Sequence, residues 1–510
     1  MKKILKEYEK QIEYFIKNKK YIFCIIIVAL LSYGFTITHY SIGIDDLCFD
    51  RYVDGNYILV AKRWGTWLLY NFLNIHSFTP FWIDLITTLN IMFLSILICS
   101  FLKRNLNNRI NDFSYIVFSC IMISSPIIFH FYIYQTTSLS VSFSAIIVVV
   151  IQILIYENFF KNNNNIYLNF LFGILMSIPI SMYESCIQIF LVMCGVSIFV
   201  STLIFKAKIK QILKYLFLNF GILLLGFVIY YLIGSIIILY LKKINKAVVN
   251  FAYEIIPWKY KVYRESSLHQ KKSFFIERTR KANSFSYLKD PTLFFNFLIL
   301  IIVYLKEIYN LIKKKNVIRF LSVMMIIISN LLLIILQGLV LYRTELSFVI
   351  TIAFAWLYLF QMAFVTKYFR NIFIILTILF TLFQTQVISK MFYTEYKKFE
   401  QEKNIATNIG FDVMKNFDYK NKPLLYTGVD NESDNGFVLK FGIYAFNEVG
   451  VETTKFINNF GFNFKYVEPT KSKIKEALNE LDTLTEEQKE NNIVETDKFI
   501  IINLSKYGIK

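Results

Sequence analysis

Long apolar blocks separated by short polar connectors constrain this chain more than any other feature. About 20 apolar residues cross the core of a bilayer as one α-helix, and blocks of about that length recur between residues 21 and 391. With 56% hydrophobic residues, the chain is too apolar for an ordinary soluble domain. We therefore predict an all-α polytopic membrane protein with about eleven transmembrane helices. The expected spans are residues 21–40, 81–102, 114–131, 138–156, 166–183, 186–205, 214–240, 292–312, 317–341, 345–366 and 371–391.

Positive charge marks one side of this array. The net charge is +19, and Lys and Arg concentrate in the short connectors between apolar blocks. Because no zinc-finger or RNA-binding signature accompanies them, nucleic acid is excluded as a partner. Short basic connectors stay in the cytoplasm. The expected cytoplasmic segments are the basic N-terminus 1–20 and the connectors 103–113, 157–165, 206–213, 313–316 and 367–370.

Larger segments are expected on the opposite, extracytoplasmic side of the membrane domain 21–391. Loop 41–80 contains KRWGTWLLYNFL, which is too short to span and is typical of an amphipathic helix on the membrane surface. Loop 242–291 mixes aromatic and charged residues in the same way. Residues 392–510 predict a small α/β domain. Its expected elements are helices near 394–417 and 471–491 and strands near 422–428 and 498–504.

The N-terminus and the cysteines exclude other classes. Seven Lys precede the first apolar block, which has no small-residue cleavage site, so we interpret this region as an uncleaved anchor. Five of the six cysteines lie in apolar blocks and only Cys48 lies in a polar segment, which argues against a disulfide framework. The four histidines show no HxxH or HExxH spacing, so we assign no metal and no cofactor.

Polar side chains gather at the outer ends of the predicted spans. Acidic groups at membrane depth are costly, so they usually face a cavity or a partner. The acid pair of YSIGIDDLCFDRY (40–52) directly follows the first span. Lys62 and Arg63 begin the predicted surface helix. Two further outer turns carry the sequences YE (183–184) and YRTE (342–345). The candidate site residues are Asp45, Asp46, Arg51, Lys62, Arg63, Tyr183, Glu184 and Arg343.

Carboxylates next to cations at a membrane surface favour glycosyl transfer from a lipid-linked sugar phosphate. The leaving phosphate needs positive charge rather than a general acid, and the guanidinium fork matches phosphate oxygens. The acceptor hydroxyl needs one carboxylate to take its proton. A second carboxylate beside it would either raise the pKa of the first by like-charge repulsion or orient the acceptor.

Each element also has a purely structural interpretation. The acid pair is compatible with a solvated loop or a helix cap. Arg63 is compatible with a lipid-anchoring side chain, and Arg343 with an ion pair to Glu345. Tyr183 and Glu184 are compatible with a hydrogen-bonded turn.

The chain resembles the bacterial Gtr-type O-antigen glucosyltransferases of the GT-C superfamily. The resemblance lies in SIGIDDLCFDRY, KRWGTWLL, SMYESCIQIF (181–190), LYRTELSF (341–348) and the C-terminal LLYTG. These motifs are short and degenerate, and the acid pair is the most specific of them. In the family a Gly commonly precedes the Arg-Trp pair, whereas this chain has Lys62 there.

The resemblance implies an inverting transfer of a hexose, expected to be glucose, from undecaprenyl phosphate to a surface polysaccharide. It implies Asp45 or Asp46 as the catalytic base and Arg63, Arg343 and Lys62 as ligands of the donor phosphate. Arg51, Tyr183 and Glu184 remain candidates for substrate binding. The expected location is the outer face of the bacterial inner membrane, with the N-terminus in the cytoplasm and membrane lipids as further partners. A divalent ion is not assigned, because its use varies across the superfamily.

Two alternatives remain open from the sequence. An envelope polysaccharide polymerase or ligase also uses outer-face Arg, but it typically places its key residues in a large late loop, and loop 242–291 has no acid pair. A transporter or flippase favours charges at mid-membrane between inverted repeats, whereas the centres of these spans are nearly free of charge.

Overall fold

The computed structural model describes most of the chain in two compact units. The first unit comprises Met1–Thr38 and Arg51–Lys390, and the second comprises His39–Asp50 and Met391–Lys510. The second unit thus takes in the segment after the first span as well as the C-terminal region. The described residues are 2–42, 46, 57–77, 79–106, 109–161, 164–244, 291–314, 316–330, 346–363, 367–427, 451–465 and 491–504.

The first unit consists of helices, and eight described segments are long and apolar enough to cross a membrane. This confirms the all-α polytopic class. Three further expected spans coincide with the shorter apolar helices α10 (Ile166–Met182), α18 (Val317–Ser329) and α20 (Leu346–Ala363), so the count of eleven remains a prediction. The eight segments are α2 (Lys19–Thr38), α6 (Pro80–Leu106), α7 with η3 and α8 (Asp112–Ile123, Pro126–Ile128, Phe129–Tyr132), α9 (Gln135–Lys161), α11 (Cys186–Ile204), α12 (Ile209–Ile244), α17 (Pro291–Lys314) and α21 (Lys367–Asn416).

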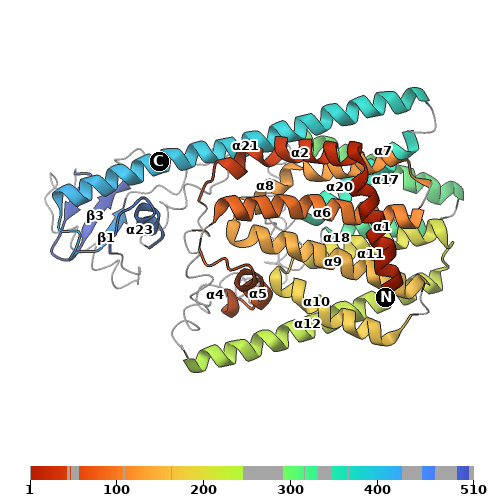
Figure 1. The fold of residues 1–510 in the computed structure, drawn as a ribbon, viewed down its shortest axis with the longest axis horizontal. Helices are drawn as coiled ribbons and strands as arrows, with labels where there is room; N and C mark the ends of the chain where they lie inside the picture. Colours follow the sequence, from red (N-terminus) through yellow and green to blue (C-terminus); the bar gives the residue numbers. More distant parts are fainter. Residues whose placement is uncertain are drawn as a thin grey trace, which may run out of the picture. The chain divides into compact units, whose positions relative to one another are not determined.

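Three helices of the first unit lie at the ends of this bundle. The N-terminal helix α1 (Lys2–Lys17) crosses one end of it, whereas the short helices α4 (Tyr57–Val60) and α5 (Trp64–Phe72) lie at the other end (Figure 1). The helix expected in KRWGTWLLYNFL is therefore present as α5. Its position at a membrane surface stays a prediction.

Helix α12 packs along α10 and extends to α4. Its buried residues recur every three or four positions from Ile212 to Ile238, which places them on one face. Near the end of α12, Ile238 and Leu241 pack against Val60 and Tyr57 of α4. At 1.5 Å per residue the 36 residues of α12 are about 54 Å long, so part of α12 must extend beyond a hydrocarbon core of about 30 Å.

The second unit combines the end of α21 with a small sheet and α23 (Val451–Asn458). Strand β1 (Leu424–Thr427) pairs parallel with β3 (Ile500–Asn503), and β2 (Ile493–Glu495) pairs antiparallel with β3. Phe399, Ala406, Ile409 and Val413 of α21 pack with the strands in one core. Both expected strands are present. The helix expected near 471–491 and most of loop 242–291 lie outside the described residues.

The chain that follows the first span packs against α21 within the second unit. The ring of His39 lies 5.2 Å from that of Tyr396, and the ring of Tyr40 lies 5.6 Å from that of Phe399. Ile42 packs against the core of the unit. The segment that leads to the acid pair is therefore supported by residues far away in sequence.

Candidate active site

Lys62 occupies an unusual backbone position between α4 and α5. Its φ is +60°, in the left-handed region that usually requires Gly. The N–H of Arg63 donates to the carbonyl of Ile58 and the N–H of Lys62 to that of Leu59, both at 2.9 Å. These two bonds form a Schellman motif, in which Gly is the usual residue at the position of Lys62. The geometry thus explains why a Gly would suit this position and shows that Lys62 is held there against its conformational preference.

The side chain of Lys62 lies against α12. Its Nζ is 3.4 Å from the centroid of the Tyr231 ring, a cation–π geometry. A Cβ added to Gly234 would lie 3.0 to 3.2 Å from three carbons of the Lys62 side chain. The absence of a side chain at Gly234 therefore leaves room for the Lys62 stem, and Tyr231 holds its ammonium group.

Arg63 faces the turn between α10 and α11. Its Nη2 is 3.8 Å from Oε2 of Glu184, and its guanidinium carbon is 5.2 Å from the ring centroid of Tyr183. The side chains of Arg63 and Glu184 are 25% and 30% exposed. At this distance and exposure the pair is weak.

A second tyrosine of α12 contacts the same glutamate. The hydroxyl of Tyr230 donates to Oε1 of Glu184 at 3.4 Å, while Tyr183 is 4% exposed. Three separate chain segments thus meet in what we call the cationic cluster. Its members are Lys62, Arg63, Tyr183, Glu184, Tyr230 and Tyr231. With two cations and one carboxylate, these six side chains carry net positive charge.

Helix α5 is fixed on α10 by a close approach at Gly65. A Cβ at this position would lie 2.3 Å from Ser181 Oγ and 2.8 Å from the carbonyl oxygen of Ile178. Next to it, the Thr66 hydroxyl donates to the carbonyl of Met182 at 2.8 Å. Only Gly permits this contact, which places Arg63 beside the turn that carries Glu184.

We expect Lys62→Gly and Lys62→Ala to separate the backbone role of this position from its charge. Both variants remove the ammonium group, but Ala keeps the left-handed strain of about 1 to 2 kcal/mol that Gly relieves. The Gly variant should therefore unfold at a higher temperature than the Ala variant in a thermal melt of the purified protein. Equal melting temperatures would refute the strain at Lys62.

The remaining candidate residues lie in the second unit or outside the described residues. Asp46 is described and is 4% exposed, and it belongs to the second unit. Asp45, Arg51 and Arg343 lie outside the described residues.

The described residues on either side of 331–345, the range that contains Arg343, contact Gln188 of α11. The side-chain nitrogen of Gln188 donates to the carbonyl of Asn330 at 3.1 Å, and the hydroxyl of Ser347 donates to Gln188 Oε1 at 3.4 Å. Gln188 lies four residues after Glu184, in the first turn of α11. Asn330 and Ser347 therefore both contact a residue close in sequence to Glu184.

Sequence reasoning missed Tyr230, Tyr231 and Gly234. Tyrosines inside an apolar block are most simply explained as an interfacial belt. The available signal was the spacing in YYLIG (230–234), because a Gly three or four residues after a Tyr places a gap beside that ring on a helix.

Helices long and apolar enough to span a membrane, with cationic and acidic side chains gathered at one end, define a polytopic membrane protein with a polar site at that end. The chain belongs to the glucosyl transferase GtrII family, whose model matches residues 33–360. The match extends from within α2 to within α20 and includes the whole cationic cluster. Membership identifies a glycosyltransferase and confirms the resemblance to the Gtr-type glucosyltransferases. Comparison with curated proteins and with solved structures finds no match.

Proposed function

We propose that this protein transfers glucose, with inversion, from a polyprenyl-phosphate donor to a cell-surface polysaccharide. The reaction would take place on the outer face of the bacterial inner membrane, with the N-terminus in the cytoplasm. The cationic cluster carries the proposal, because it places a guanidinium and an ammonium near one end of long apolar helices. A lipid phosphate presents its charge at that depth.

The proposed reaction is one displacement at the anomeric carbon of the sugar. The acceptor hydroxyl oxygen forms a bond to this carbon on the face opposite the phosphate. The bond from the carbon to the phosphate oxygen breaks, and polyprenyl phosphate leaves with the electron pair. The acceptor proton passes to the carboxylate of Asp45 or Asp46. The donor phosphate gains negative charge as it leaves, so cations beside it stabilise the transition state more than the ground state.

The remaining candidates bind substrate in this proposal. Arg63 and Lys62 hold the donor phosphate, and Arg343 adds a third cation. Tyr183 and Glu184 contact the transferred sugar, and Arg51 contacts the acceptor. Phosphate binding would separate Arg63 from Glu184, which would free the Glu184 carboxylate to accept hydrogen bonds from sugar hydroxyls.

Surface glycan from cells that lack the protein tests this proposal. Complementation with the wild type should add the mass of one hexose per acceptor unit. Arg63→Ala should lower the extent of this addition, because its transfer rate falls about 10- to 100-fold when a charge-assisted contact to phosphate is lost. Lys210→Ala, which changes an exposed cation in the first turn of α12, should restore the full mass.

The same mass spectra distinguish the alternatives. A change in glycan chain length without an added hexose would indicate a polymerase or ligase and overturn the proposal. Absence of the whole glycan from the surface would indicate a transporter.

A further inference from the structure

Helix α1 presents three different stripes around its circumference. At about 100° per residue, Tyr8 and Phe15 share one stripe, and both are buried at 7% and 1% exposed. Leu5, Ile12 and Ile16 form a second, apolar stripe, of which Leu5 and Ile16 are 49% and 55% exposed. A third stripe consists of exposed Lys6, Lys10 and Lys17. The apolar stripe lies between the buried stripe and the basic one.

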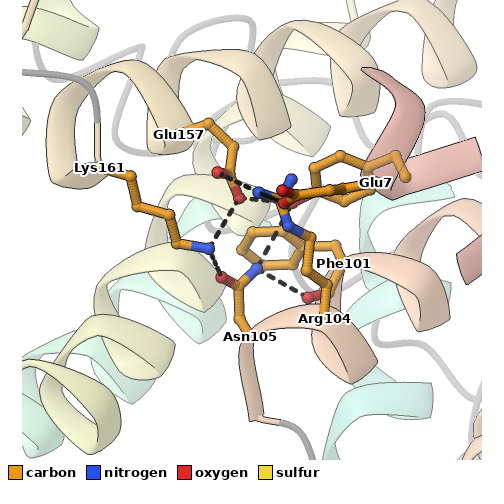
Figure 2. A network of polar contacts seen from close by, with 7 residues as sticks. Glu7, Phe101, Arg104, Asn105, Glu157 and Lys161 are labelled. Atoms are coloured by element: carbon orange, nitrogen blue, oxygen red, sulfur yellow. Dashed lines mark hydrogen bonds and ion pairs between the residues drawn. The ribbon is translucent and has the colours of Figure 1, made fainter. Parts of the chain in front are cut away.

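The buried stripe fastens α1 to the bundle. The Tyr8 hydroxyl donates to Glu157 Oε1 of α9 at 2.8 Å, and burial raises the pKa of Tyr8 well above its usual value, so the hydroxyl keeps its proton. Beside it, Glu7 lies 2.6 Å from Arg104 of α6. Figure 2 shows Glu7 on one side of Arg104 and Glu157 on the other. These contacts fix which faces of α1 remain exposed.

The apolar stripe leads directly into a membrane span. Only Asn18 separates α1 from α2, and its side-chain oxygen accepts the N–H of Tyr21 at 3.2 Å, which caps α2 where the chain turns. Helix α1 consequently crosses the end of the bundle, and α2 runs along it (Figure 1). On α2, Phe23 and Leu30 are 64% and 61% exposed. An apolar stripe on a helix at this place fits the boundary between headgroups and acyl chains.

The basic stripe lies on the far side of Glu9 and Glu13 from the apolar stripe. Lys6, Lys10 and Lys17, with Lys19 and Lys20 at the junction, outnumber Glu9 and Glu13, the two acids of α1 besides Glu7, which pairs with Arg104. Glu13 pairs with Lys17 at 2.5 Å, but the two side chains are 54% and 74% exposed, so this pair is weak and Lys17 can also contact an external anion. Lysine stems can lie along apolar surface while their ammonium groups reach phosphates.

We propose that α1 binds anionic phospholipid headgroups and lies in the membrane interface beside the first span. The apolar stripe enters the acyl boundary, and the lysines contact headgroup phosphates. A lipid surface fits better than a protein partner, because α1 leads directly into α2, an apolar helix long enough to span a membrane, on which Phe23 and Leu30 are exposed. This inference does not depend on the proposed transferase reaction.

The test compares hydrogen exchange of α1 amides in nanodiscs of phosphatidylcholine and of phosphatidylcholine mixed with phosphatidylglycerol. In the full-length wild type, exchange should be slower in the mixed discs. The variant Lys6→Gln, Lys10→Gln, Lys17→Gln should lose this difference, and native mass spectrometry should show phosphatidylglycerol binding weakened about fivefold per lysine. A matched variant with Lys415→Gln, Lys420→Gln and Lys465→Gln changes three exposed lysines of the second unit. This variant should keep the difference in exchange between the two disc types.

Two further experiments distinguish a membrane headgroup from free phosphate as the ligand of α1. Arg at positions 6, 10 and 17 should preserve the lipid dependence, because its guanidinium also binds phosphate. Inorganic phosphate added to phosphatidylcholine discs should give no protection if headgroups at a membrane surface are the ligand. Equal exchange of wild-type α1 in both disc types, or an undiminished difference in the Gln variant, would overturn the proposal.

Discussion

Asp45→Asn and Asp46→Asn are each expected to leave the amount of folded protein unchanged, and at least one should abolish hexose transfer. An amide cannot accept the acceptor proton, and loss of a general base typically costs 10²- to 10⁴-fold in rate. The variant that removes the base should lower kcat. The variant that removes the helper should shift the pH profile, because a neighbouring carboxylate raises the pKa of the base. Transfer is measured with purified protein and a polyprenyl-phosphate-glucose donor.

Two controls make this result interpretable. Asp46 is 4% exposed, so its variant is compared with the wild type by thermal unfolding before any loss of activity is assigned to chemistry. Asp412→Asn changes an exposed carboxylate of the same unit and should retain full activity. Wild-type transfer by both Asp45→Asn and Asp46→Asn would exclude the acid pair from catalysis.

The spans could be predicted because apolar length is a local property of the sequence. The end of a helix depends instead on residues that interrupt the helical backbone, such as Gly and Pro. The change from apolar to polar composition near residue 391 marks the expected membrane boundary, yet α21 continues without a break to Asn416. No Gly or Pro occurs between residues 367 and 409, so nothing in the backbone ends the helix where its hydropathy changes.

The candidate site could be predicted only in part, because its members come from distant segments. Polar residues beside apolar blocks are conspicuous, which identified Lys62, Arg63, Tyr183 and Glu184. The tyrosines of α12 have no such contrast with their surroundings. The left-handed Lys62 also contradicts its local propensity, and the Schellman hydrogen bonds and Tyr231 hold it in place. Packing of Ile42 against a core about 400 residues later follows from tertiary structure alone.

Glu157→Ala is expected to be the most destabilising single change in the first unit. Glu157 is fully buried, with Arg104 Nη2 at 3.0 Å from one oxygen and Lys161 Nζ at 3.2 Å from the other. Removing it leaves Arg104, which is only 10% exposed, without its buried counter-charge. Breaking a buried pair in this way typically costs 3 to 5 kcal/mol, so a decrease of several degrees in the melting temperature is expected.

Glu7→Ala is the matched control, because Glu7 contacts the same Arg104 nitrogen at 2.6 Å but is 43% exposed. Exposed pairs contribute about 0 to 1 kcal/mol, so this variant should melt close to the wild type. Combining Glu157→Leu with Arg104→Met should recover part of the loss, since it removes both buried charges, and Lys161, at 29% exposed, can turn toward water. If Glu157→Ala and Glu7→Ala melt alike, burial does not determine the strength of this network. If the double variant is no more stable than Glu157→Ala, the unpaired arginine is not the source of the loss.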